Sequence, residues 1–179
     1  QLSQAGLSLS GNAGAVTILS GISLAVNPSE TLALTGPSGS GKSSLLMLMG
    51  GLERATSGQV LALGQDLGQM DEDALAKFRL AHMGIVFQSF HLIPTLTALE
   101  NVALPLQEHT DLDQEIIDIQ VKIKLELVGL REHADKYPAQ ISGGMKKRAG
   151  LARALALDPK ILFYDEPSAG LDPVTSAEI

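Results

Sequence analysis

A glycine-rich turn between an apolar run and a helical pattern limits the possible folds of this chain more than any other feature. The turn covers 36–43, reads GPSGSGKS and fits the pattern G-x-x-x-x-G-K-[ST] in full. The apolar run over 31–35 predicts a strand before it, and the strong helix formers over 42–49 predict a helix after it, ended by Gly50 and Gly51. A strand, a glycine turn and a helix in this order form a βα unit, so we expect an α/β fold.

The chemistry of this turn suits an anion. Glycines lack a Cβ, so the backbone can approach a phosphate closely, and the N–H groups of the turn and of the following helix point at the anion. We expect Lys42 to reach the β and γ phosphates and the Ser43 hydroxyl to hold Mg²⁺. A glycine turn that binds nothing is the alternative, but the complete motif in its expected context favours a phosphate. The predicted binding residues are Gly36, Pro37, Ser38, Gly39, Ser40, Gly41, Lys42, Ser43 and Ser44.

The composition excludes several classes of protein. The 179 residues include 13 Lys and Arg against 20 Asp and Glu, a net charge of −7. Because a protein that neutralises nucleic-acid phosphates needs clustered excess cations, we expect no nucleic-acid partner. No Cys is present, so no disulfide and no thiolate zinc site forms. Neither a secretory leader nor a run of about 20 apolar residues occurs, so we expect a cytoplasmic protein without direct membrane insertion.

A second apolar run ends in two carboxylates. The run over 161–164 is continuous, as in a strand buried on both faces of a parallel sheet, and Asp165 and Glu166 follow it. At the tip of a strand, Asp165 suits a Mg²⁺ ligand acting through water, and Glu166 can accept a proton from an attacking water. Many strands end in idle acids, but the glycine turn earlier in the chain favours a functional interpretation here.

The rest of the chain alternates between strand and helix patterns. Short β-type runs predict further strands at 16–19, 22–26, 59–63 and 83–87. The segment 117–127 alternates apolar and polar residues as a strand does, whereas its length and the capping residues Asp111 and Asp113 favour a helix, which we expect. On that helix four apolar residues share one face: Ile116, Ile119, Ile123 and Leu127.

A serine and two glycines precede the last predicted helix. Ser142, Gly143 and Gly144 come before a helix expected over 145–157, which the dipeptide at 158–159 ends. Ser-Gly-Gly is an ordinary helix N-cap when taken alone, and it is also a backbone nest for an anion. Its place just upstream of the acidic strand favours the anion.

Taken in order, these motifs resemble the nucleotide-binding domain of ABC transporters over nearly the whole chain. The set also includes Gln88 after an apolar strand and the loop 168–172. The resemblance implies a P-loop NTPase of the ABC type, with a mixed sheet core, an N-terminal antiparallel β part and an inserted helical subdomain. It implies one domain over 1–179, cut short at its C-terminus, with the catalytic core in about 1–90 and 158–179 and the helical subdomain in about 91–157.

The resemblance also implies residue roles in ATP hydrolysis. Lys42 and Ser43 would bind phosphate and magnesium, Gln88 would sense Mg²⁺ and the attacking water, and Glu166 would be the general base. Together with Asp165, the implied magnesium residues are Ser43 and Gln88. The implied cofactors are ATP and Mg²⁺.

In the same family, two subunits close on each ATP. Ser142, Gly143 and Gly144 would clasp the γ-phosphate of ATP held by a second copy, and Asp172 would link the two sites. The implied partners are therefore a second nucleotide-binding subunit, as a homodimer, and an integral membrane permease that holds the protein on the cytoplasmic face of the inner membrane.

The chain departs from the family pattern in three ways. Met145 stands where glutamine is commonest, and no aromatic residue precedes the glycine turn to stack on adenine. The switch histidine does not occur before Ile179, so we expect residues 1–179 alone to hydrolyse ATP poorly. The apolar segment 89–94 is either core or the docking point of the permease, and His91 within it is more simply a contact residue than a metal ligand.

The subfamily pattern is divided. Residues 1–105 resemble ATPases of lipoprotein release and macrolide efflux, and residues from 106 onward resemble the Mla-type ATPases of phospholipid trafficking. Both predict an envelope lipid or lipoprotein system, in a natural intermediate or in a joined sequence. A non-transport ATPase switch that regulates a membrane complex is the alternative. A P-loop kinase or GTPase fits less well, because Ser142 to Gly144 has no use there and no Asn-Lys-x-Asp occurs.

Overall fold

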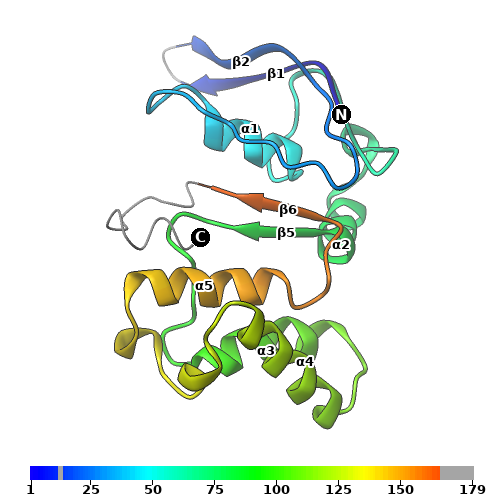
Figure 1. The fold of residues 1–179 in the computed structure, drawn as a ribbon. Helices are drawn as coiled ribbons and strands as arrows, with labels where there is room; N and C mark the ends of the chain where they lie inside the picture. The colour runs from blue at the N-terminus through cyan, green and yellow to red at the C-terminus, as the bar shows by residue number, and fades with distance from the viewer. Residues whose placement is uncertain (12–13, 166–179) are drawn as a thin grey trace. The chain divides into compact units, whose positions relative to one another are not determined.

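The computed structural model describes residues 1–11 and 14–165. The chain forms two compact units, one over Gln1–Arg79 and one that begins at Leu80. Figure 1 traces the elements of both along the chain. The motifs that the sequence predicts to bind nucleotide are divided between these units.

The first unit contains a four-stranded antiparallel sheet in the order β2-β1-β3-β4. Its strands are β1 (Leu2–Gly11), β2 (Gly14–Leu24), β3 (Ser57–Ala62) and β4 (Gln65–Asp66). Leu2, Ala5 and Leu7 of β1 are buried. The antiparallel β part expected near the N-terminus is therefore confirmed, and β3 matches the strand expected at 59–63.

In this unit two expected strands form one continuous strand, and one expected strand does not form. The strands expected at 16–19 and 22–26 are one strand, β2, because Gly21 adopts a φ of 61° at an irregularity in the β1–β2 register and the strand continues past it. The segment 31–35 lies outside the sheets of the described structure, and Leu32 within it is 41% exposed. A strand needs a hydrogen-bonded neighbour, and apolar composition alone does not supply one.

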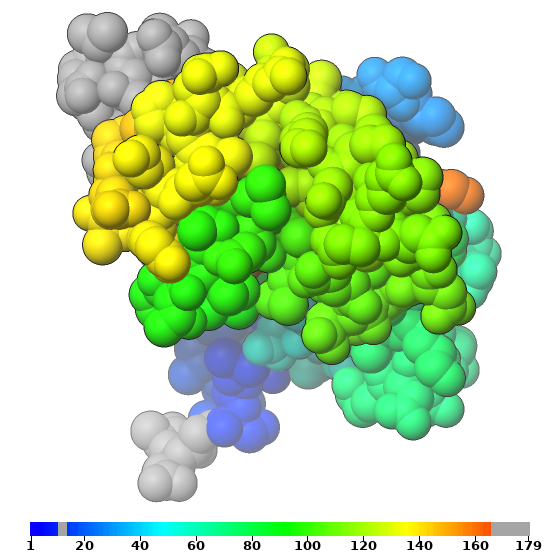
Figure 2. Space-filling model, turned by 90° about the horizontal axis from the view of Figure 1, so that it is seen from below, coloured from blue at the N-terminus to red at the C-terminus, as the bar shows by residue number. Residues whose placement is uncertain are grey.

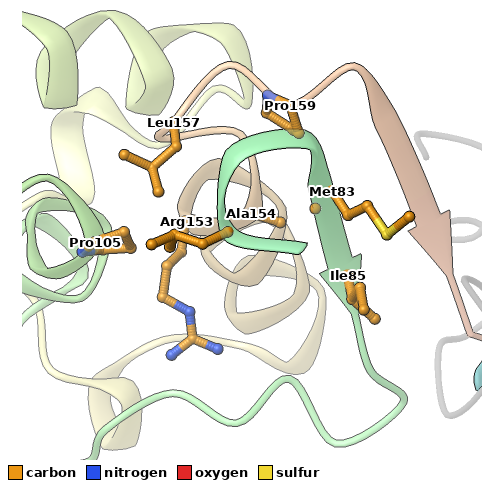
Figure 3. A pocket seen from close by; sticks show the side chains of 9 residues that line it. Met83, Ile85, Pro105, Arg153, Ala154, Leu157 and Pro159 are labelled. Atoms are coloured by element: carbon orange, nitrogen blue, oxygen red, sulfur yellow. The ribbon is translucent and has the colours of Figure 1, made fainter. Parts of the chain in front are cut away.

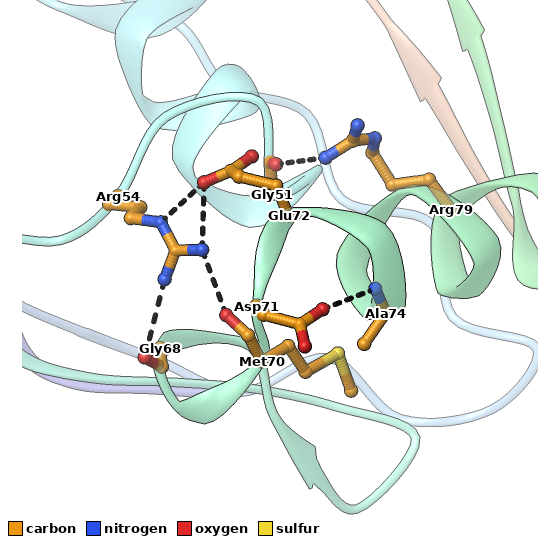
Figure 4. A network of polar contacts seen from close by, with 8 residues as sticks. All are labelled: Gly51, Arg54, Gly68, Met70, Asp71, Glu72, Ala74 and Arg79. Atoms are coloured by element: carbon orange, nitrogen blue, oxygen red, sulfur yellow. Dashed lines mark hydrogen bonds and ion pairs between the residues drawn. The ribbon is translucent and has the colours of Figure 1, made fainter.

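Helix α1 (Lys42–Met49) confirms the helix expected after the glycine turn. It ends where expected, since the Gly50 N–H donates to the Leu46 carbonyl at 2.8 Å and Gly51 turns the chain with a φ of 64°. The residues that follow are fixed to the start of α2 (Glu72–His82) by Arg54, as Figure 4 shows.

The Arg54 guanidinium connects the segment after α1 to the start of α2. Its Nε and Nη2 donate to Glu72 Oε1 at 2.9 and 2.8 Å, and Nη2 also donates to the Met70 carbonyl at 2.8 Å. Arg79, farther along α2, donates to the Gly51 carbonyl at 2.6 Å. Arg54 and Arg79 thus tie α2 to the segment that leaves α1.

The second unit combines a short parallel sheet with a cluster of helices. Its elements are β5 (Met83–Val86), α3 (Ala98–His109), α4 (Gln114–Leu127), η2 (Arg131–His133), η3 (Pro138–Gln140), α5 (Gly143–Ala154) and β6 (Ile161–Tyr164). β5 and β6 pair in parallel, as the α/β interpretation expects. The expectation that the strand at 161–164 is buried on both faces is wrong, since Leu162 of β6 is 40% exposed. The apolar core of this unit lies among α3, α4 and α5.

Helix α4 includes the segment 117–127, whose sequence pattern allows a strand or a helix, and it confirms the helix. The four residues expected on one face do share it, but that face points outward: Ile116, Ile119, Ile123 and Leu127 are 42 to 69% exposed. The opposite face carries Ile117, Val121 and Leu125 into the core. In Figure 2 the yellow-green surface of this part of the chain is open to the viewer.

Helix α3 begins with a capping box. Thr97 accepts from the Glu100 N–H at 3.2 Å, and the Glu100 carboxylate accepts from the Thr97 N–H and hydroxyl at 2.7 and 2.8 Å. The bond from the Thr97 N–H, and to a smaller extent the bond from its hydroxyl, lower the pKa of Glu100 below its ordinary value. Among residues 1–11 and 14–165, no helix combines the length and apolar character needed to cross a bilayer.

Candidate functional site

The glycine turn over 36–43 forms a loop between the exposed segment 31–35 and α1. Gly36 and Gly41 adopt φ values of 156° and 89°, which only glycine takes without strain. A Cβ at Gly36 would lie 2.9 Å from Ser40 Oγ, and one at Gly41 would lie 3.0 Å from Leu19 Cδ2 of β2. The loop is therefore closely packed on the inside while its outer side, 36–40, is exposed.

Lys42 closes this loop. Its Nζ donates to the carbonyl oxygens of Gly36 and Pro37, each at 2.9 Å. An anion entering the loop would meet this ammonium and the N-terminus of α1, where Gly41 supplies no side-chain cap and the first turn has no acidic residue. The positive end of the helix dipole is thus left for a ligand, and the loop fits a phosphate group.

In the second unit, Gln88 and Asp165 lie at the same edge of the parallel sheet. Val86 pairs with Tyr164 in the register, and the Asp165 N–H donates to the Val86 carbonyl at 3.0 Å, so both strands end together. Oxygen-bearing side chains at the carboxyl ends of adjacent parallel strands suit a hard cation. Burial raises the pKa of Tyr164 to about 12, so its phenol is neutral at physiological pH. Glu166 and Asp172 lie outside the described residues.

Ser142 forms the N-cap of α5. Its Oγ accepts from the Met145 N–H at 3.2 Å, so the ordinary capping role is present. Ser142 and Gly143 are exposed, and a Cβ at Gly143 would meet no atom within 4 Å. The cap leaves the helix N-terminus accessible to an anion from outside, and α5 starts two residues before the expected position.

The structure thus divides the predicted site residues into two groups. Lys42, Ser43 and the rest of the loop belong to the first unit, whereas Gln88, Asp165 and 142–144 belong to the second. A comparison with known protein families matches the ABC transporter family over residues 19–169, a span that includes both groups. The chain belongs to the ABC transporter family. It is accordingly an ATP-binding, ATP-hydrolysing protein.

Two relatives illustrate the range of the family. The chain is 49% identical over 164 residues to the uncharacterized ABC transporter ATP-binding protein YbbA of Escherichia coli strain K12, covering 92% of this chain and 72% of YbbA. It is 45% identical over 157 residues to the methionine import ATP-binding protein MetN 1 of Pseudomonas syringae pv. syringae strain B728a, covering 88% of this chain and 47% of MetN 1. Neither name specifies lipoprotein release or phospholipid trafficking.

Solved structures agree on the fold. The dimeric ATP-binding cassette MJ0796 bound to ADP and Pi is similar with a TM-score of 0.91 and 35% identity, over 99% of this chain and 78% of that one. CbiO1 of Clostridium perfringens, part of the complex CbiONQ, is similar with a TM-score of 0.88 and 28% identity, over 99% and 68% of the two chains. The ABC ATPase fold is therefore confirmed.

The segment after Gln88 is only partly core. The Phe90 Cβ lies 3.6 Å from where a Cβ of Gly150 would be, and Leu92 packs on the helical core, but Ile93 is 37% exposed. The imidazole of His91 meets the Phe87 ring edge to face, with centroids 5.1 Å apart. The segment is therefore partly core, and its docking to a permease stays a prediction.

Arg153 of α5 is a residue near this site that the sequence did not single out. Its Nη1 and Nη2 donate to the carbonyl oxygens of His91 and Phe90 at 2.7 and 2.9 Å. Burial lowers the pKa of this guanidinium, which still stays protonated at physiological pH. The contact joins residues 62 and 63 positions apart, and no local pattern reveals it.

An apolar pocket of about 190 Å³ lies beside Arg153 (Figure 3). It is lined by Leu80, Met83, Gly84, Ile85, Pro105, Arg153, Ala154, Leu157 and Pro159. None of the predicted phosphate or magnesium residues lines it. The residues predicted to bind nucleotide therefore lie outside this pocket.

Proposed function

We propose that this chain is the ATP-hydrolysing subunit of a bacterial ABC transporter and acts as a homodimer bound to a membrane permease. The observation that carries the proposal is the loop over 36–43, in which Lys42 and the uncapped start of α1 form an anion site. The dimeric state of MJ0796 with ADP and Pi supports the same arrangement here.

The proposed site has two parts. Lys42 and the loop N–H groups bind the phosphates of one ATP, while Ser142 and Gly143 of a second copy, exposed at the start of α5, contact its γ-phosphate. We assign these two parts to a core of about 1–90 and 158–179 and to a helical subdomain of about 91–157. Asp172 connects the paired sites in this proposal. Closure of the dimer on ATP and its reopening after hydrolysis then move the permease.

Magnesium belongs to the same proposal. Ser43, Gln88 and Asp165 would hold it, and two of these side chains share the edge of the β5–β6 sheet. The ion supplies charge neutralisation on the phosphates when it is bound. Glu166 accepts the proton of the attacking water as general base.

A pair of substitutions in the full-length protein tests these roles. Glu166→Gln should keep ATP binding and abolish hydrolysis, because the amide cannot accept the proton. Lys42→Ala should lose both, because the phosphates lose their ammonium partner. ATP binding is followed with a fluorescent nucleotide and hydrolysis by phosphate release. Undiminished hydrolysis by Glu166→Gln would remove its assignment as base.

For the transported substrate we propose an envelope lipid or lipoprotein, on the motif resemblance over 87–90, 99–102 and 142–148. The 45% identity to MetN 1 supports methionine import as a second candidate. Stimulation of ATPase activity in the complex reconstituted with its permease separates the two: phospholipid or lipoprotein is expected to stimulate, and stimulation by methionine alone would favour import. If a pull-down instead recovers a membrane protein that has no translocation pathway, a non-transport switch is favoured.

A further inference from the structure

Helix α5 holds the segment that follows Gln88 at three points. The Arg153 guanidinium donates to the carbonyl oxygens of Phe90 and His91 at 2.9 and 2.7 Å. Lys147 Nζ lies 5.7 Å from the centroid of the Phe90 ring, and Phe90 packs beside Gly150, where a Cβ would lie 3.6 Å from the Phe90 Cβ and carbonyl oxygen. The three contacts come from successive turns of one face of α5.

The segment needs such support because its backbone is strained. Phe90 and His91 adopt φ values of 60° and 45°, in the left-handed region that disfavours residues with a Cβ. Residues in a helical conformation of either hand direct consecutive carbonyls the same way, whereas extended residues alternate them. Two successive left-handed residues can therefore present both oxygens to one planar guanidinium, which donates to both at once.

The bonds within the turn complete its geometry. The Phe90 N–H donates to Phe87 O at 3.0 Å, and the His91 N–H donates to Ser89 O at 2.7 Å. On the far side, the buried amide of Asn101 accepts from the Ile93 N–H at 2.8 Å. Gln88 thus lies between the end of β5 and a turn that is fixed from outside by α5.

Arg153 is itself held in place. Its stem lines the apolar pocket with Pro105, and in Figure 3 the guanidinium extends away from Met83 and Ile85 toward the segment after β5. Since the side chain is half-buried, its charge needs acceptors, and the two carbonyls supply them.

We propose that Arg153 is a positioning residue for Gln88: by holding Phe90 and His91 in the left-handed turn, it keeps Gln88 at the sheet edge beside Asp165. The inference rests on the proposed function, because Gln88 matters only if hydrolysis takes place at that edge. It also links Gln88 to the helix whose first turn carries Ser142 and Gly143.

The first test compares two arginines of α5 in the full-length protein. Arg153→Gln removes the paired donors, and Arg148→Gln is the matched control, since Arg148 donates to the Val128 carbonyl at 3.2 Å, away from Gln88. We expect Arg153→Gln to lower kcat by about 10- to 100-fold with the KM for ATP nearly unchanged, as misplacement of a catalytic group does. Arg148→Gln should change the unfolding midpoint to a similar extent but leave kcat near wild type.

A rescue variant separates positioning from general stability. Glycine adopts a φ of 45° without strain, so His91→Gly should make the turn less dependent on the arginine. We expect Arg153→Gln with His91→Gly to recover most of the lost kcat. No recovery, or an equal fall of kcat in Arg148→Gln, would overturn the proposal.

A readout without activity keeps the inference independent of the proposed function. Hydrogen exchange of the amides at 88–92, measured without nucleotide, should be faster in Arg153→Gln than in Arg148→Gln, because the turn opens more often. If wild-type protein exchanges slowly there but hydrolyses no ATP, the proposed function fails, while the hold of Arg153 on the turn at Phe90 and His91 stands. Equal exchange in the two variants would show that Arg153 does not hold this turn, and would overturn the inference.

Discussion

Lys124 shows how a single charge is accommodated inside the helical core. Its side chain is 9% exposed on α4, and its ammonium forms an ion pair with the carboxylate of Asp158, which is 75% exposed. Burial of an unpaired ammonium is costly, so Asp158 contributes to stability mainly by sparing Lys124 that cost, and less by the attraction between the two charges. Asp158 has a φ of 51°, a conformation that Asn also tolerates, so the carboxylate can be neutralised without backbone strain.

At this position we expect Asp158→Asn to lower the free energy of unfolding by about 1–2 kcal/mol, because the buried ammonium keeps only a neutral acceptor. Lys124→Met should cost less, since it removes the charge while filling similar space. Urea denaturation of the two single variants and the double variant checks this. A larger loss in Lys124→Met than in Asp158→Asn would show that the lysine stem, not the charge, stabilises the core.

At the scale of elements, α4 shows what local pattern can and cannot predict. Length and capping identified the helix, but both of its faces carry apolar residues, so the sequence could not tell which one is buried. Packing against α3 and α5 decided for Val121 and Leu125 and left Ile119 and Ile123 outside. For the same reason the apolar run at 31–35 predicts a strand that the structure lacks, because strand pairing depends on residues elsewhere in the chain.

Two leucines of α4 give a matched test of that orientation. Leu125 is 1% exposed and Leu127 is 69% exposed. We expect Leu125→Ala to cost about 3 kcal/mol of unfolding free energy through lost burial and a cavity, and Leu127→Ala to stay within about 0.5 kcal/mol of wild type. Thermal and urea unfolding measure both. Equal losses would mean that the outer face of α4 is also covered.

At the scale of the whole molecule, predictability follows the range of the contacts. The loop at 36–43 was predictable because its motif lies in consecutive residues, and two apolar runs predicted the strands β5 and β6, although not their pairing with each other. Arg153 was not predictable, because its partners lie 62 and 63 residues away and are backbone carbonyls, which leave no trace in side-chain pattern. Long-range contacts to the backbone are the part of this site that only a structure reveals.

Nucleotide binding should also be visible as stability of the whole protein. A ligand that binds only the folded state stabilises it by about 2.7 kcal/mol when its concentration is 100 times its Kd. We therefore expect ATP to raise the unfolding temperature of wild type and of Glu166→Gln, which keeps the loop at 36–43 intact. Lys42→Ala should show little shift, because its loop lacks the ammonium that now contacts Gly36 and Pro37 at 2.9 Å. Differential scanning fluorimetry across an ATP titration measures this, and an equal shift in Lys42→Ala would place nucleotide binding somewhere other than this loop.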